Sequence, residues 1–317
     1  MTTQNKTAVV AVGGNALILD KAHEDVSSQV SAVEETCKHI ADMIVQGWNV
    51  VVTHGNGPQV GFILRRNELA YPEVHSTPLD VIGADTQGAI GYMISRALDN
   101  EFKQRGIQRN VAAVVTQVLV DRDDPGFKNP TKGIGGFTTQ EKAEIFKQEG
   151  WIVKEDAGRG WRRMIASPMP LKIVEFDAIK TLIDNGFIVA GVGGGGIPVI
   201  ENEQGEFQGV FAVIDKDRAS SLLAAELKAD LLLISTAVEK VALNFNKPDQ
   251  KNLDRMTLSE ARQYYKEGHF LSGSMGPKIE AIIAFLEANP KGQALITDPP
   301  HIVDALNGKT GTWIVQD

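Results

Sequence analysis

The sequence lacks the features that mark several special classes of protein. Its one cysteine, Cys37, excludes an intramolecular disulfide and a zinc site built from several cysteines, and it fits a reducing compartment. No apolar run approaches the roughly 20 residues that cross a bilayer. Positive charge is not in excess, since the formal net charge is −8, and this argues against broad binding to nucleic acid. Residues 1–6 lack the charged and apolar regions of a signal peptide, so we expect a cytoplasmic protein that binds neither membrane nor nucleic acid.

Several recurrent sequence motifs are also missing. There is no internal repeat of the kind that builds solenoids, and no GxxxxGK[ST] phosphate-binding loop. The six histidines share no metal-ligand spacing, so we assign no metal to them. No serine-hydrolase elbow or catalytic-cysteine signature occurs, and Cys37 falls on the apolar face of a predicted helix, where core packing is the better interpretation.

What is present is typical of a globular α/β protein. The composition is 43% hydrophobic and 23% charged, and 317 residues suffice for one large domain or two modest ones. Short apolar runs predict strands at 7–12, 48–53, 111–120, 187–192, 210–214, 231–236, 294–297 and, at an edge, 312–315. Apolar spacings of three and four predict helices at 27–46, 59–70, 85–104, 172–185, 218–228, 257–267, 277–288 and 301–306.

Strand and helix alternate along most of the chain. This order predicts an open, mainly parallel, twisted sheet with helices on both faces. In such sheets ligands bind beyond the carboxyl ends of the strands.

Residues 121–170 interrupt this alternation. The segment is rich in charge and glycine, contains one plausible helix at 140–148, and carries aromatic residues that argue against disorder. A long irregular segment inside a compact domain is usually functional. We therefore predict a small subdomain that projects from the main body.

Glycines gather where three predicted strands end. The turns are Gly13-Gly14-Asn15, Gly55-Asn56-Gly57 and the run 193–196. Glycine permits positive φ and lets a ligand reach backbone N–H groups, which together can hold an anion. One such turn is usually a mere chain reversal, but three at the same sheet edge predict phosphate binding.

Lysines accompany these turns. Lys216, flanked by Asp215 and Asp217, follows a predicted strand, and Lys278 falls in the first turn of a predicted helix, where an anion would compensate its charge. The alternative for Lys216 and its flanking acids is a solvated charged turn. Lys132 lies in the irregular segment, with Arg159, Arg162 and Arg163 further along it, and for these solvation and ligand binding stay equally open. His54 adjoins the second glycine turn either as a ligand contact or as a structural histidine bonded to a neighbouring carbonyl.

Seven segments, in order over almost the whole chain, resemble the motifs of the carbamate kinases, which belong to the amino-acid kinase fold family. They are VVAVGGNAL at 9–17, HGNGPQVG at 54–61, FKNPTK at 127–132, KEDAGRGW at 154–161, GGGGIPV at 193–199, AVIDKD at 212–217 and SGSMGPK at 272–278. The resemblance implies one domain over 1–317, a projecting flap at 121–170, and a homodimer. It also implies reversible phosphoryl transfer between carbamoyl phosphate and ADP, which yields ATP and carbamate, in fermentative breakdown of arginine or other ureido compounds.

The resemblance also implies roles for individual residues. Lys216 and Lys278 would hold the transferring phosphoryl group and the ADP phosphates, with Asp217 orienting them. Lys132 would serve carbamoyl phosphate and replace a lysine that many amino-acid kinases carry at the position of Ala11. Asp215 would assist Asp217 or meet Mg²⁺, which arrives mainly with ATP or ADP. The phosphate cradle would consist of Gly13, Gly14, Asn15, Gly55, Asn56, Gly194 and Gly195, and the adenine would lie in the 210–317 part near Thr236, Val238 and Met275.

Three alternatives remain open on the sequence. The same fold could act on a different acid such as acetylglutamate, although Ala11 and the 121–170 insertion weigh against this. The chain could sense carbamoyl phosphate without turnover, or it could be a paralogue with another substrate.

Overall fold

The computed structural model describes residues 6–14, 25–148, 150–155, 160–270 and 275–317. Its centre is an eight-stranded sheet in the order β15-β17-β16-β12-β1-β2-β9-β3, in which every adjacent pair except β16–β17 is parallel. The predicted open, mainly parallel sheet is therefore confirmed. The bounds are β1 (Thr7–Val12), β2 (Asn49–His54), β3 (Val111–Ala113), β9 (Ile188–Ala190), β12 (Leu231–Ser235), β15 (Arg255–Thr257), β16 (Gln293–Thr297) and β17 (Thr312–Val315).

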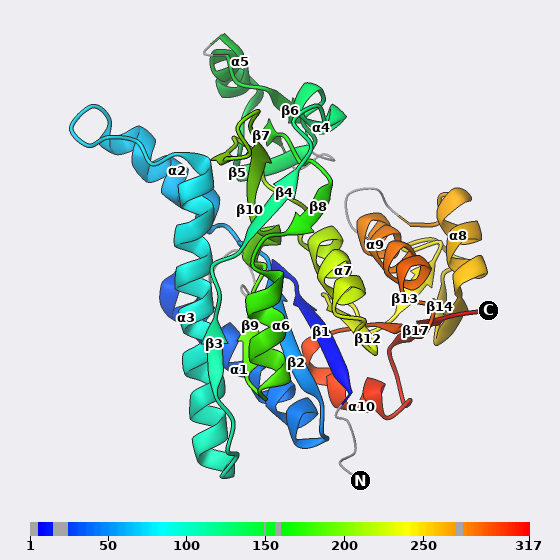
Figure 1. Cartoon of the computed structure of the whole chain (residues 1–317). Helices are drawn as coiled ribbons and strands as arrows, with labels where there is room; N and C mark the ends of the chain where they lie inside the picture. The colour runs from blue at the N-terminus through cyan, green and yellow to red at the C-terminus, as the bar shows by residue number, and fades with distance from the viewer. Residues whose placement is uncertain (1–5, 15–24, 149, 156–159, 271–274) are drawn as a thin grey trace.

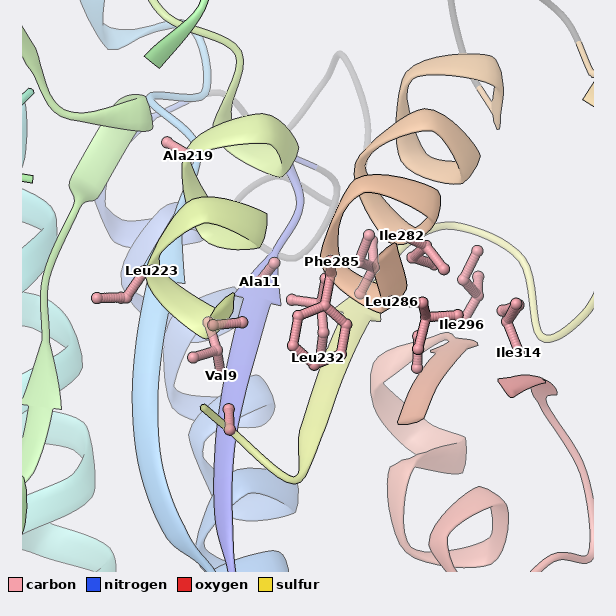
Figure 2. Close-up of a cluster of buried hydrophobic side chains, with 14 of the residues drawn as sticks. Val9, Ala11, Ala219, Leu223, Leu232, Ile282, Phe285, Leu286, Ile296 and Ile314 are labelled. Carbon is pink, nitrogen blue, oxygen red and sulfur yellow. The ribbon is translucent and has the colours of Figure 1, made fainter. Parts of the chain in front are cut away.

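Helices cover both faces of this sheet, and the alternation of side chains along β1 shows how. Ala8 and Val10 contribute to a core with α1 (Val26–Val45), α3 (Leu79–Arg105) and α10 (Ile302–Leu306). Val9 and Ala11 point to the other core, formed with α6 (Phe176–Asp184), α7 (Lys216–Glu226), α8 (Leu258–Lys266) and α9 (Met275–Ala288). Figure 2 shows Val9 and Ala11 beside Leu223 of α7 and Phe285 of α9. Because both faces of β1 are buried, its run of apolar residues is continuous rather than alternating with polar ones.

A second sheet, in the order β11-β10-β4-β8, lies beyond the carboxyl ends of the parallel strands of the first sheet (Figure 1). Its strands are β4 (Gln117–Val120), β8 (Pro170–Ile173), β10 (Ile197–Glu201) and β11 (Phe207–Gly209). The prediction of one strand over 111–120 was wrong, because that segment is divided between β3 and β4. The break has a physical cause: the Thr116 amide donates to the Gln87 side chain at 2.7 Å instead of to a neighbouring strand.

A third, smaller sheet, β5-β7-β6, projects from the main body and lies at the top of Figure 1 with α5. It comprises β5 (Lys132–Thr138), β6 (Val153–Glu155) and β7 (Trp161–Ile165), preceded by α4 (Pro125–Lys128) and interrupted by α5 (Gln140–Gln148). It follows β4 and precedes β8, so it occupies the irregular segment 121–170. It meets the body at α2 (Gln59–Ala70), where Gly61 approaches Gly135 so closely that an added Cβ would clash with the Gly135 backbone.

Four other details differ from the sequence-based expectations. No strand spans 210–214, where Ala212 makes only an isolated bridge to Ala166. Helix α6 begins at Phe176, because Pro170–Ile173 pairs with β4 instead. Helix α3 begins at Leu79, six residues before the predicted start at 85, and β17 is covered by β15 and is not an edge.

The remaining elements are short. They are the hairpin β13 (Val241–Leu243) and β14 (Lys251–Leu253), and the 3₁₀ turns η2 (Gly193–Gly195) and η3 (Pro299–His301). Within the described part of the chain, no helix combines the length and the apolar character needed to span a membrane.

Candidate active site

The glycine turns meet where β1, β2 and β9 end. The Gly13 amide donates to the Ser235 carbonyl at 3.1 Å, and the Gly55 amide donates to the Val12 carbonyl at 3.1 Å. An added Cβ on Gly55 would lie 3.8 Å from both the Gly14 nitrogen and the Lys216 Cδ. Two of the predicted turns and Lys216 therefore adjoin one another at one edge of the large sheet.

The third turn, η2, requires glycine for its own geometry. Gly194 and Gly195 have φ of 65° and 92°, and an added Cβ would clash with the Asn56 side chain in the first case and lie 2.5 Å from the Ile214 carbonyl in the second. Gly194 thus packs directly on Asn56, which joins this turn to the second one. Close backbone approach explains these two glycines independently of any ligand.

Two polar residues that the sequence did not single out hold these turns. Thr86 donates to Asn56 Oδ1 at 3.0 Å, and Gln87 Nε2 donates to the Gly193 and Thr116 carbonyls at 2.9 and 3.0 Å. Both side chains are buried. A signal was present in the sequence, since Gln87 interrupts the apolar stripe that continues through Ile90 and Ile94 of the same helix.

Two lysines share one carboxylate at the start of α7. Lys216 Nζ lies 2.5 Å from Asp217 Oδ1, and Lys278 Nζ lies 2.9 Å from Asp217 Oδ2. Burial would raise the pKa of Asp217, but attraction to Lys216 and Lys278 outweighs it and keeps that pKa below its ordinary value. Burial lowers the pKa of Lys216; Asp217 opposes this change, and the charge of Lys278 adds to it. The group therefore concentrates positive charge where solvent has been removed.

Asp215 joins the small sheet to this group. Its Oδ1 caps α7 by accepting from the Asp217 amide at 2.9 Å, and its Oδ2 accepts from Lys132 Nζ at 2.7 Å. Burial disfavours the charged carboxylate, but Lys132 attracts it more strongly, so the pKa of Asp215 lies well below its usual range. Lys132 belongs to β5, and the ion pair therefore brings a predicted substrate residue to the main site from a separate sheet.

His54 fits the structural interpretation. Its ring is buried, Nδ1 lies 2.9 Å from the Gly55 carbonyl, and an added Cβ on Gly193 would clash with Nε2. Burial lowers the pKa of His54 to about 4, and the nearby charge of Lys216 acts in the same direction. The neutral imidazole therefore packs between the second and third glycine turns and fixes the distance between them.

The predicted adenine residues lie partly together. Val238 and Met275 line an apolar pocket with Phe245 and Phe270, and an open hollow of about 330 Å³ adjoins it, lined by Val238, Phe245 and Asn252. Thr236 does not line either hollow, and its amide donates to the Thr297 carbonyl at 2.9 Å.

Some predicted site residues have a different place or none. Asn15, Arg159 and residues 272–274 of the SGSMGPK segment lie outside the described residues. Arg162 lies over the Phe137 ring at 5.1 Å and Arg163 over the Trp151 ring at 3.9 Å, so neither is simply solvated.

The site's carboxylates do not offer Mg²⁺ a dedicated set of ligands. No group of three metal-ligating side chains occurs among the residues that the structure describes. Asp217 already bonds to two ammonium groups, and Asp215 to Lys132 and a backbone amide. The donor set therefore fits cations supplied by lysine and does not fit a metal ion held by the protein alone.

Comparisons with known proteins show the family of this chain. The model of the amino acid kinase family matches residues 6–297. A carbamate kinase of Thermococcus kodakarensis is 49% identical over 98% of this chain and 100% of its own length, and the carbamate kinase-like protein YqeA of Escherichia coli is 49% identical over 98% and 100%. The solved structure of a Giardia lamblia carbamate kinase bound to AMP-PNP has a TM-score of 0.92 and 46% identity, with complete coverage of both chains. This chain therefore belongs to the amino acid kinase family and, within it, to the carbamate kinases.

Proposed function

We propose that this kinase transfers a phosphoryl group reversibly between carbamoyl phosphate and ADP, giving ATP and carbamate. The observation that carries the proposal is the pair of partly buried lysines, Lys216 and Lys278, on the single buried carboxylate of Asp217 beside the glycine turns. Both substrates are anions, and phosphoryl transfer needs mainly alignment and charge neutralisation rather than covalent help.

Each residue has a definite task in this mechanism. Lys216 and Lys278 neutralise the transferring phosphoryl group and the ADP phosphates, and Asp217 pairs with both ammonium groups and orients them. The amide of Gly14 binds a phosphate oxygen, and Gly13 and Gly55, whose own amides donate to backbone carbonyls, let the phosphate approach the turns closely. Asn56, Gly194 and Gly195 form the opposite wall. The adenine occupies the hollow beside Val238 and Met275, with Thr236 at its sheet edge. Mg²⁺ bound to the nucleotide phosphates supplies further charge neutralisation.

Lys132 serves the carbamoyl phosphate side, and segment 121–170 acts as a flap that carries it. Support comes from the position of Lys132 on the small sheet, from its ion pair with Asp215 across to α7, and from Ala11 at the buried position where many relatives of this fold carry lysine. Closure over the substrate excludes water from a reactive phosphate.

The biological setting is part of the same proposal. The enzyme acts in the cytoplasm, in fermentative catabolism of arginine or another ureido compound, where carbamate decomposes to ammonia and carbon dioxide. It forms a homodimer, supported by exposed Val81 and Tyr92, which lie three turns apart on α3 next to the edge strand β3. Analytical ultracentrifugation should give twice 34.3 kDa at micromolar concentration, and a monomer mass would contradict the dimer.

One assay tests the activity. ATP formation from ADP is measured with carbamoyl phosphate, acetyl phosphate or acetylglutamyl phosphate as the donor. We expect carbamoyl phosphate to give a kcat/KM at least 10²-fold above the other two. Equal rates, or turnover only with another donor, would overturn the substrate assignment and favour a paralogue like those named carbamate kinase-like.

A further inference from the structure

A third hollow lies away from the lysines, between the small sheet and the main body. It is a cleft of about 1050 Å³ whose lining includes Tyr71, Asp80, Trp151, Arg163 and Phe211. The walls come from the end of α2, the start of α3, the small sheet and the segment after β11. None of these residues belongs to the site described above.

Arg163 is prepared in this cleft for a planar anion. Its guanidinium carbon lies 3.9 Å from the Trp151 ring centre and 5.3 Å from that of Phe211, so aromatic rings cover its faces. Within the described part of the chain it makes no hydrogen bond or ion pair. The edges of a stacked guanidinium carry parallel N–H donors that match a carboxylate in bidentate geometry.

Asp80 provides the opposite charge in the same cleft. Its carboxylate lies directly against the backbone of Gly209, and among the described residues it has no hydrogen-bonding partner. Glu68, a second acid in the lining, is already paired with Arg65 at 3.0 Å. One carboxylate and one guanidinium that lack a hydrogen-bonding partner among the described residues thus line a cleft that also exposes Tyr71 and Phe211.

These features together define a ligand class. We infer that the cleft binds a free α-amino acid with an apolar or aromatic side chain. Its carboxylate pairs with Arg163, its ammonium group with Asp80, and its side chain with Tyr71 and Phe211. A phosphate ester fits less well, because Asp80 and Glu68 repel a dianion.

The strand register connects this cleft to Lys132. In the β5–β7 ladder Arg163 is opposite Ile134, and Lys132 is opposite Ile165. Since side chains alternate along a strand, all four lie on one face of the small sheet. Ile134 and Ile165 pack with Val60, Leu79 and Ile82 in a separate apolar cluster. The cleft and the Lys132–Asp215 ion pair therefore lie at the two ends of one interface, and an amino acid that bridges Arg163 to Asp80 holds the small sheet against the body.

Calorimetric titration tests the binding without any need for turnover, so its failure is distinguishable from failure of the proposed function. The probes are L-phenylalanine and L-leucine, with phenethylamine and 3-phenylpropionate as analogues that each lack one charge. We expect at least one amino acid to bind with a millimolar or lower Kd, and each analogue to bind at least ten-fold more weakly. R163Q and D80N should each weaken binding at least ten-fold, whereas the matched surface variant R66Q should not change it. Absence of binding by both amino acids, or equal binding of the analogues, would overturn the site.

Two further measurements complete the test. R163K keeps the cation and the aromatic contact but loses the bidentate edge, so it should fold with an unchanged melting temperature and still bind more weakly; full binding by R163K would contradict the bidentate contact. Hydrogen exchange in 132–138 and 161–165 should slow when the amino acid binds. Binding without slower exchange would overturn the coupling to Lys132.

Discussion

Lys216 and Lys278 reach the same carboxylate from two helices, α7 and α9, that begin 59 residues apart, and each contacts one oxygen of Asp217. Two ammonium groups this close repel each other, and Asp217 is what holds them in one place. Because two ammonium groups share one carboxylate, the cluster keeps an excess of positive charge that attracts an incoming phosphoryl group. The cations that neutralise the phosphoryl group are therefore in position before the substrate binds, which is the condition for electrostatic preorganisation.

Removal of one of these cations should be costly for catalysis. Lys216→Ala should lower kcat by about 10²–10³-fold, the loss typical of one preorganised charge donor. Steady-state assays with carbamoyl phosphate and ADP measure this, and Lys180→Ala, which removes an exposed lysine of α6, should leave kcat unchanged. Wild-type turnover by Lys216→Ala would show that the phosphoryl group binds elsewhere.

The counter-charge can be tested separately. Asp217→Asn keeps the shape of the side chain but leaves Lys216 and Lys278 to repel each other in a buried place. We expect kcat to fall by about 10²-fold or more, and the pKa of Lys216 to fall further. A kcat that recovers at lower pH in the variant, but not in the wild type, would identify lysine deprotonation as the cause. An unchanged rate would contradict the orienting role of Asp217.

The glycine cradle is best tested by a substitution at Gly14. A side chain at Gly194 would strike Asn56 and one at Gly13 would approach the Ser235 carbonyl at 2.9 Å, so either change disturbs the turns themselves. Nothing lies within 4 Å of a Cβ added at Gly14. Gly14→Ala should therefore keep the wild-type melting temperature and raise the Kd for nucleotide or carbamoyl phosphate by at least ten-fold. Unchanged affinity in calorimetry would place the cradle elsewhere.

His54 should make the fold sensitive to mild acid. Its pKa is about 4 when folded, below the 6.5 of an ordinary histidine, so the unfolded chain binds more protons between these values. Stability from this group is complete above pH 6.5 and is lost as the pH falls toward 4. Between pH 7 and 5 the loss amounts to about 2 kcal/mol. Urea unfolding of the wild type and of His54→Gln measures the free energy of unfolding at both pH values. The decrease between pH 7 and pH 5 should be about 2 kcal/mol smaller in the variant than in the wild type. The same decrease in both proteins would contradict the buried neutral imidazole.

Lys132 should affect one substrate more than the other. Lys132→Ala should raise KM for carbamoyl phosphate and lower kcat while the affinity for ADP stays nearly unchanged, because the small sheet carries this lysine to the substrate side. Lys128→Ala, an exposed lysine of the same segment, is the matched control. Hydrogen exchange across 121–170 should slow with a bisubstrate analogue. A kinetically silent Lys132→Ala together with equal exchange would leave the flap without support.

The large sheet was predictable because its signal is local. Strands such as β1 are buried on both faces and therefore read as continuous apolar runs, while the helices on either side keep their spacing of three and four. The prediction failed where distant groups decide the local structure. The division of 111–120 depends on Gln87, which comes from another helix and takes the Thr116 amide, and residues 170–173 became a strand because β4 lies beside them.

The site shows the same division. Glycine-rich turns and nearby lysines suggest phosphate binding by their residue types alone. The sequence was therefore enough to select Gly13, Gly55, Lys216 and Lys278. The pairing of Lys132 with Asp215 spans 83 positions and depends on how the small sheet folds back, which no local pattern encodes. Thr86 and Gln87 act only through the partners that they hold.

The contact of Gly61 with Gly135 has a mechanical consequence. Where α2 meets β5, backbone touches backbone with no side chain between them. Interdigitated side chains would have to separate before one element could rotate against the other. Two glycines have no side chains that interdigitate, so they do not oppose this rotation. In the proposed closure, β5 turns against α2 at this contact, and the rotation moves Lys132 at the start of the same strand. A methyl group at Gly61 would clash with the Gly135 backbone and force the small sheet away from α2.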